Sequence, residues 1–238
     1  MSSQTPTPFK RHSTANKILN ALPHDVMARL QPNLEKSSLS LGQVLYRVDD
    51  KTDFVYFPDN SMVSVIANTA EGQSAEVGVV GREGIVGLNV FLGVDSTPNE
   101  LLVQISDGST RIGVKAARRE FVRGGELQKL ILRFTHDFMT QISQTALCNR
   151  LHTIEERLSR WLLMCRDRSE TNDLPLTQEF LSIMLGANRP SITIAAINLQ
   201  SAGLIKYSRG HIKILNREEL EDSSCTCYRK VVEESDRK

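Results

Sequence analysis

The pattern of apolar residues changes near Phe121, and this change constrains the fold more than any other feature of the chain. Between Ser38 and about Val114, short runs rich in β-branched and aromatic residues alternate with turn clusters such as residues 58–61. Regularly spaced short strands with turn signals indicate an antiparallel sandwich or barrel. After Phe121 the apolar residues recur at steps of three and four, which is typical of helices. The sequence therefore predicts an α+β chain, in which an N-terminal antiparallel β-roll precedes a helical C-terminal half.

The predicted strands lie at residues 44–46, 54–57, 62–66, 75–80, 101–105 and 111–114. They belong to a β-roll domain over residues 15–123, which begins with one short amphipathic helix at residues 15–30. Residues 1–14 are polar and rich in Pro, Thr and Ser, so we expect a disordered tail there rather than a secretory signal. No apolar run approaches the ~20 residues needed to span a bilayer. We therefore expect a cytoplasmic protein with no membrane partner.

A long helix is predicted over residues 124–152, and its apolar residues form a seam close to a heptad repeat. The seam consists of Leu127, Ile131, Phe134, Phe138, Ile142 and Thr145. A second copy of the chain is a simple partner for such a seam, because a twofold interface is complementary to itself. We therefore interpret this segment as a dimerisation helix. The alternative is that the same face packs on the β-roll.

The C-terminal domain, residues 153–238, contains the features of a winged helix-turn-helix. Thr177 can cap one short helix, and Gly186 can provide the positive φ of a tight turn. Asn188 can cap a second helix, in which Pro190 is tolerated because the first turn has no use for its N–H. Two short helices joined through a Gly turn form a helix-turn-helix. Residues 204–214 are predicted to form a β-hairpin after the helix-turn-helix, and this hairpin is the wing.

Charge is concentrated around this motif, although the net charge of the whole chain is only +1. Residues 174–217 contain five basic residues and one acid, and a local basic face is what contact with DNA phosphates requires. Arg189 is the best candidate for a base contact, because a guanidinium pairs bidentately with guanine. Thr177 and Ser191 are better placed for phosphates. The predicted DNA-binding residues are Thr177, Gln178, Asn188, Arg189, Pro190, Ser191, Thr193, Lys206, Arg209 and Lys213. The alternative places Arg189 in a structural ion pair and makes the motif a protein-binding module.

Three stretches carry a resemblance to a known family: residues 81–87 (Gly-Arg-Glu-Gly-Ile-Val-Gly), 156–163 (Glu-Arg-Leu-Ser-Arg-Trp-Leu-Leu) and 176–205. With the order of its domains, the chain resembles the Crp/Fnr family of bacterial transcription regulators over about residues 15–228. The resemblance implies a homodimer that binds a near-palindromic operator and senses an effector in the β-roll. It implies double-stranded DNA, a second copy of the chain and RNA polymerase as partners.

The chain departs from the members of this family that bind cyclic AMP. Those members carry a Gly-Glu pair and, about ten residues on, an Arg-Ser pair, whereas this sequence has Gly87-Leu88 and Thr97-Pro98. A bidentate Arg–phosphate contact is thereby lost, unless Arg82 or Arg111 replaces it. We expect an effector other than cyclic AMP in its usual pose. The predicted pocket consists of Gly84, Val86, Gly87, Leu88, Asn89, Thr97, Asn99 and Ser143.

Cysteine and histidine positions argue against cofactors and catalysis. The iron–sulfur members of the family use an N-terminal cysteine cluster, whereas this chain has no cysteine before Cys148. No histidine lies between residues 38 and 114, and His12 and His24 are poorly placed as haem ligands. A cupin-like metal enzyme therefore has no ligand set, and we expect no enzyme, no haem and no metal.

The remaining cysteines are interpreted separately. Cys148 and Cys165 lie on apolar helix faces and are predicted to be core residues. Cys225 and Cys227 could bind a metal or form a redox switch, but one pair supplies only half the thiolates of a structural zinc site. We favour free surface cysteines in a tail.

Overall fold

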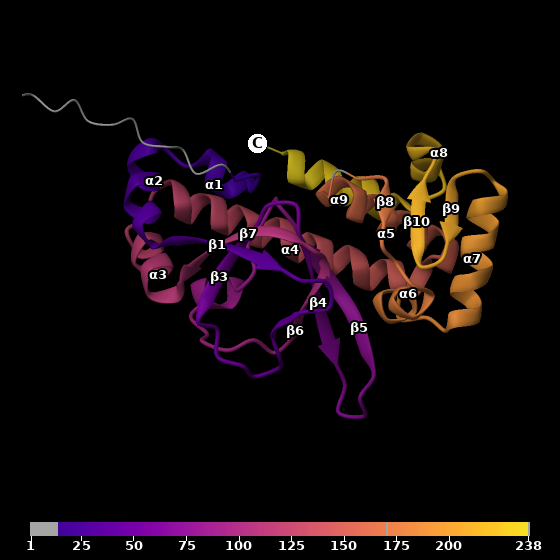
Figure 1. The fold of residues 1–238 in the computed structure, drawn as a ribbon, viewed down its shortest axis with the longest axis horizontal. Helices are drawn as coiled ribbons and strands as arrows, with labels where there is room; N and C mark the ends of the chain where they lie inside the picture. Colours follow the sequence, from indigo (N-terminus) through magenta and orange to yellow (C-terminus); the bar gives the residue numbers. More distant parts are fainter. Residues whose placement is uncertain (1–13, 170, 238) are drawn as a thin grey trace, which may run out of the picture.

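The computed structural model describes residues 14–169 and 171–237. A long helix, α4 (Glu126–Leu151), runs through the molecule, with the β domain along its first part and a helical domain at its far end (Figure 1). This is the predicted α+β architecture. The predicted tail at residues 1–14 and His12 lie outside the described residues, except for Thr14, which donates a hydrogen bond to Asp59.

The first helical segment is divided in two, which corrects the prediction of one helix over residues 15–30. Helix α1 (Lys17–Ala21) is capped by Asn16, whose side chain accepts hydrogen bonds from two backbone N–H groups. Helix α2 (His24–Leu30) begins after Pro23. A proline has no N–H to donate and disfavours a helical conformation at the residue before it, so the helix stops at Leu22-Pro23. The short 3-10 helix η1 (Gln31–Asn33) follows.

The β domain contains seven strands within the described residues, all paired antiparallel. They are β1 (Leu34–Leu39), β2 (Val44–Tyr46), β3 (Phe54–Pro58), β4 (Met62–Asn68), β5 (Ser74–Val80), β6 (Glu100–Ile105) and β7 (Asp107–Gly113). One sheet has the order β1-β7-β3, and the other has the order β2-β6-β4-β5. Strand β1 was not predicted, because only its end residues Leu34 and Leu39 are buried. The 3-10 helix η2 (Leu88–Phe91) follows Gly87, which has a φ of 96°.

Two helices leave the β domain in succession. Helix α3 (Val114–Val122) follows β7 directly, and α4 begins after Gly124 and Gly125, which both have positive φ. Glycine adopts that conformation without the steric cost that other residues meet, so this turn redirects the chain along the sheet.

The predicted seam of α4 faces the chain's own β domain, and this corrects its assignment to a dimer interface. Leu127, Ile131 and Phe134 are buried in the core of the β domain, and Phe138 packs against it. Ile142 and Thr145 are half-buried, and Thr145 accepts a hydrogen bond from Arg160 of the helix that follows α4. The opposite face of α4 exposes large apolar side chains, namely Leu132, Met139, Leu147 and Leu151. Periodicity identified an apolar face correctly, but the β domain of the same chain covers it.

The C-terminal domain is built on α5 (Ile154–Ser169), which follows α4 after a break at His152. Its other elements are β8 (Asp173–Leu174), α6 (Gln178–Met184), α7 (Arg189–Ser201), β9 (Ile205–Ser208), β10 (His211–Ile214), α8 (Arg217–Asp222) and α9 (Thr226–Asp236). The sheet order is β8-β10-β9. Helices α8 and α9 were not predicted, and α9 returns to pack on α4 (Figure 1).

Within the described residues no single helix is long and apolar enough to span a membrane. Helices α6 and α7 reach the required length and apolar composition only when they are taken together, and a 106° bend separates them.

A buried carboxyl group joins the two domains. Trp161 of α5 donates from Nε1 to Oε1 of Glu76 on β5, at 2.8 Å. The hydroxyl of Ser64 donates to the other oxygen of Glu76 at 2.6 Å. Burial raises the pKa of Glu76 to about 7, against the opposing effects of these hydrogen bonds and of Arg160 and Arg168. The contact between the domains therefore contains a carboxyl group that titrates near neutral pH.

This carboxyl group predicts a pH dependence of stability. The pKa of Glu76 is higher in the folded chain than its ordinary value of 4.5, so the folded state binds its proton more tightly. Stability from this group is fully present below about pH 4.5 and is lost as the pH rises to about 7. Glutamine at position 76 cannot titrate. As the pH rises from about 4.5 to about 7, the free energy of unfolding of Glu76→Gln should therefore increase relative to that of wild type, by up to roughly 3 kcal/mol. Urea denaturation of both proteins at several pH values measures this, and a pH-independent difference would contradict the assignment.

Candidate functional site

The helix-turn-helix is fixed by two side-chain caps. Oγ1 of Thr177 accepts from the backbone N–H of Phe180 at 3.2 Å, which starts α6. Oδ1 of Asn188 accepts from the N–H of Ser191 at 2.9 Å, which starts α7. Between the two helices Gly186 has a φ of 55°, and the helices bend by 106°. The inner face of α7, with Ile192 and Leu199 fully buried, packs into the domain core and leaves the outer face free.

The outer face of α7 carries one arginine and two isoleucines. Arg189 and Pro190 are exposed at the start of the helix. Ile194 is 61% exposed and Ile197 is 56% exposed, and neither is among the predicted DNA-binding residues. Thr193 is half-buried and donates its hydroxyl to the carbonyl of Arg189 at 2.9 Å. Exposed apolar side chains beside an arginine suit the major groove, where thymine methyl groups alternate with hydrogen-bonding edges.

Arg189 forms an ion pair with Glu179 of α6, with 2.6 Å between Nη2 and Oε1. The two side chains are 59% and 67% exposed, so water competes for both charges. Exposed pairs of this kind contribute about 0–1 kcal/mol. The pair therefore positions the guanidinium near the start of α7, and the side chain stays exposed to solvent.

The wing presents its basic residues to solvent. Arg209 and Gly210 both have positive φ, at 50° and 79°, as a tight two-residue hairpin turn requires. Lys206 and Lys213 lie directly opposite each other on β9 and β10, and both are exposed. Like charges opposite each other destabilise a sheet, and a bound anion relieves this repulsion. The hairpin is thus a candidate phosphate contact.

The wing turn approaches the start of α6. A Cβ atom on Gly210 would lie 3.4 Å from Cγ2 of Thr177. Gln178 is half-buried, and its backbone contacts Tyr207 of β9. The predicted DNA-binding residues therefore lie on three neighbouring segments: the start of α6, the start of α7 and the wing.

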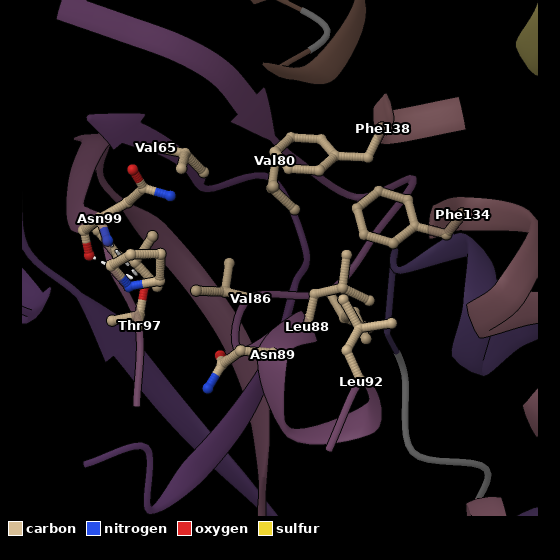
Figure 2. A pocket seen from close by; sticks show the side chains of 14 residues that line it. Val65, Val80, Val86, Leu88, Asn89, Leu92, Thr97, Asn99, Phe134 and Phe138 are labelled. Atoms are coloured by element: carbon tan, nitrogen blue, oxygen red, sulfur yellow. Dashed lines mark hydrogen bonds between the residues drawn. The ribbon is translucent and has the colours of Figure 1, made fainter. Parts of the chain in front are cut away.

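The β domain contains a cavity of about 160 Å³ beside α4. Figure 2 shows Phe134 and Phe138 of α4 on one side, facing the strand and loop residues of the β-roll. The predicted pocket residues that line it are Val86, Gly87, Leu88, Asn89, Thr97 and Asn99. Gly84 and Ser143 do not line it: a Cβ on Gly84 would overlap the Phe134 ring, and the exposed Ser143 donates its hydroxyl to the carbonyl of Met139.

The lining of the cavity is mostly apolar, and it includes no charged side chain among the described residues. Nδ2 of Asn89 donates to Oγ1 of Thr52 at 3.1 Å, and Thr97 donates to the carbonyl of Asn99 at 3.0 Å, so both side chains already have partners. Arg111, a candidate for phosphate binding, pairs instead with Glu35 at 2.9 Å. Arg82 does not line the cavity either. A cavity of about 150 Å³ can hold benzene, so this one suits a small apolar group better than a nucleotide.

The C-terminal cysteines are not exposed, which corrects their assignment to a surface tail. Cys225 and Cys227 are buried where α8 meets α9. They lie against Cys148 of α4, which is buried as predicted. Cys165 of α5 is also buried as predicted, in the hydrophobic core of the C-terminal domain. His24, one of the two histidines considered for haem, begins α2 and does not line the cavity.

Comparison with known proteins supports this geometry. Residues 156–223 match the family model of the Crp-like helix-turn-helix domain. No curated protein sequence matches the chain. Among solved structures, FixK2 from Bradyrhizobium japonicum is 15% identical with a TM-score of 0.69, covering 81% of this chain and 98% of its own. The c-di-GMP-responsive regulator CLP from Xanthomonas campestris is 15% identical with a TM-score of 0.66, covering 82% and 100%. A Crp-family transcriptional regulator from Thermus thermophilus is 13% identical with a TM-score of 0.67, covering 79% and 96%.

These matches confirm the resemblance stated from the sequence. The fold is that of Crp/Fnr regulators, and the C-terminal domain is a Crp-like helix-turn-helix. Residues 156–223 thus form a Crp-like helix-turn-helix domain, joined to a β domain that has the fold of the solved Crp/Fnr regulators.

The cavity predicts how the chain responds to cyclic AMP. Because no charged side chain among the described residues lines the cavity, a nucleotide phosphate has no partner there. We expect cyclic AMP at about 1 mM to leave the thermal midpoint of the full chain unchanged, since only a ligand that binds the folded state raises it. A thermal-shift titration measures this. A saturable rise in the midpoint would show that the cavity accepts the phosphate after all.

Proposed function

We propose that this chain is a sequence-specific transcription regulator that binds double-stranded DNA as a homodimer and responds to an effector other than cyclic AMP. The observation that carries the proposal is the exposed Arg189 at the start of α7, flanked by the basic wing. The N-terminal residues of such a recognition helix reach base edges in the major groove. Since it acts on DNA, we place the protein in the cytoplasm.

Arg189 reads a base by exchanging its carboxylate partner for guanine. The exposed pair with Glu179 is weak, whereas a bidentate contact with guanine contributes ~1–3 kcal/mol of discrimination. Ile194 and Ile197 then face thymine methyl groups. Lys206, Lys213 and Arg209 contact phosphates from the wing and set the register.

The outer face of α4 supports dimerisation. Its other face is occupied by the β domain, whereas Leu132, Met139, Leu147 and Leu151 remain exposed. A second α4 can cover these residues across a twofold axis, and each chain then presents one recognition helix. The two half-sites would be about 34 Å apart, one turn of DNA.

The cavity beside α4 supports an effector that is small, uncharged and largely apolar. A ligand there contacts Phe134 and Phe138, which belong to the same helix as the proposed dimer face. A ligand that prefers one packing of α4 shifts the population of dimers toward that arrangement. The orientation of the two DNA-binding domains would change with it.

The competing function is an effector-binding module that signals through protein contacts, with RNA polymerase among the possible partners, and without reading DNA. The cross-strand lysine pair of the wing favours DNA, because a phosphate contact relieves its repulsion. Regulators of either kind work by binding, and the proposal includes no catalytic step.

Replacement of Arg189 tests the proposed base contact. Once an operator has been selected from a random duplex library, Arg189→Ala should weaken binding to it by ~1–3 kcal/mol and relax specificity at one position per half-site. Fluorescence anisotropy on single-base variants of the operator measures both effects.

Arg209→Ala is the matched control, since it removes a wing charge without touching α7. It should weaken all sequences about equally and reduce the dependence of affinity on salt. If Arg189→Ala behaves like this control, Arg189 is a phosphate contact. If the library yields no bound duplex at all, the competing function holds.

Replacement of Met139 tests the proposed dimer face. Met139 is 63% exposed, so Met139→Glu should leave the protomer folded. It should weaken self-association more than about tenfold, because two carboxylates would be buried without partners near the twofold axis. Sedimentation equilibrium measures this, with Leu41→Glu as a control at an exposed leucine outside α4. Equal association of both variants would exclude this face.

A further inference from the structure

Four metal-binding side chains meet where α4 ends and α9 begins. Cys148 lies in the last turn of α4, and His152 caps its C-terminus. Cys225 precedes α9, and Cys227 lies in its first turn. One donor atom from each of these residues lies within 4.8 Å of all the others. The Cys225–Cys227 pair is evident in the sequence, but its position beside Cys148 and His152 depends on the packing of α9 on α4.

The distances fit a single tetrahedral ion. Sγ of Cys148 and Sγ of Cys225 are 3.4 Å apart, and Sγ of Cys227 is 3.7 Å from Nδ1 of His152. Zinc with bonds of about 2.3 Å to sulfur and about 2.0 Å to nitrogen places tetrahedral ligand atoms roughly 3.4–3.8 Å apart. A disulfide would need about 2.05 Å between sulfurs, and all four cysteines of the chain are free. Helices α4 and α9 therefore already hold the four side chains near coordination geometry.

The surroundings suit a thiolate-rich site. The three cysteines are buried and His152 is half-buried, so the ligand set is closed by protein rather than open to substrate. Metal coordination requires deprotonated thiols and a neutral imidazole.

Two buried arginines provide compensating charge. Three thiolates, one neutral histidine and one divalent ion leave a net charge of −1. Arg157 and Arg160 are buried and line one small cavity together with Cys148. The Nε atoms of both guanidinium groups are buried without a hydrogen-bond partner among the described residues. A negatively charged metal site would stabilise these two cations.

We propose that Cys148, His152, Cys225 and Cys227 bind one zinc ion that clamps α9 to the end of α4. Zinc is favoured over magnesium or calcium because the donors are sulfur and nitrogen. Four protein ligands with no open position characterise a structural zinc site rather than a catalytic one.

The position gives the ion a structural consequence. His152 lies at the break between α4 and α5, where the DNA-binding domain begins. An ion bound there ties this break to α9 and fixes the direction in which α5 leaves α4. Loss of the ion would loosen the DNA-binding domain relative to α4. This consequence rests on the proposed DNA-binding function, whereas zinc binding itself does not.

Metal analysis of the full chain tests the proposal. Protein purified without a tag under reducing conditions, with zinc in the medium, should contain one zinc ion per protomer. Replacement of zinc by Co²⁺ should give thiolate-to-cobalt charge-transfer absorption and the visible bands of a tetrahedral site. Cys225→Ser and His152→Gln should each lose the tetrahedral Co²⁺ spectrum. Cys165→Ser is the matched control, because Cys165 is buried and free but lies outside the cluster, and it should keep the ion.

Two results would overturn the proposal. Reduced, folded wild type that holds no zinc and gives no cobalt spectrum shows that the four residues form only a packed contact. Iron with acid-labile sulfide shows a cluster instead of a single ion. If Cys225→Ser fails to fold, the half-buried His152→Gln still decides the matter, with far-ultraviolet circular dichroism as the folding control. Failure of DNA binding with zinc retained would count against the proposed function and not against this site.

Discussion

The packing of α4 against the β domain is the contact on which the rest of the structure depends. Phe134 and Phe138 close one side of the cavity, and the side chain of Gln141 holds the backbone of Val79 through Oε1 at 2.6 Å and Nε2 at 3.1 Å. Because one face of α4 is used in this way, only the opposite face is free for a second chain. The same helix ends at the break that leads into the DNA-binding domain. Cavity, proposed dimer face and DNA-reading helix are thus all positioned by one buried surface.

A second set of contacts joins the domains around α5. Trp161 reaches Glu76 on β5, and Arg157 donates to the carbonyl of Leu185 just before the turn of the helix-turn-helix. Glu83 of the β domain pairs with Arg168 at 2.8 Å. The β domain therefore contacts both the middle and the last turn of α5. Contacts through β5 and α5 therefore connect α4 with α7. The cluster of Cys148, His152, Cys225 and Cys227 joins α9 to the end of α4, beside the break between α4 and α5.

Much of the fold and the DNA-reading motif could be predicted because they depend on local rules. The caps at Thr177 and Asn188 and the glycine turn between them are readable from neighbouring residues, and the structure shows those hydrogen bonds. Features that depend on distant parts of the chain were missed. Periodicity showed that α4 has an apolar face but could not show that residues of the same chain cover it. Strand β1 is held by pairing with β7, more than seventy residues later, and carries little apolar signal of its own. Cys148 and Cys225 are 77 positions apart, so a pair of cysteines near the C-terminus gave no sign of its other two partners.

In the proposed complex, two copies of this chain place their α7 helices in successive major grooves. Hydroxyl-radical footprinting of the full chain on a selected duplex should then show protection with twofold symmetry, centred on two half-sites about ten base pairs apart. A single unpaired block of protection, or two blocks without symmetry, would contradict it.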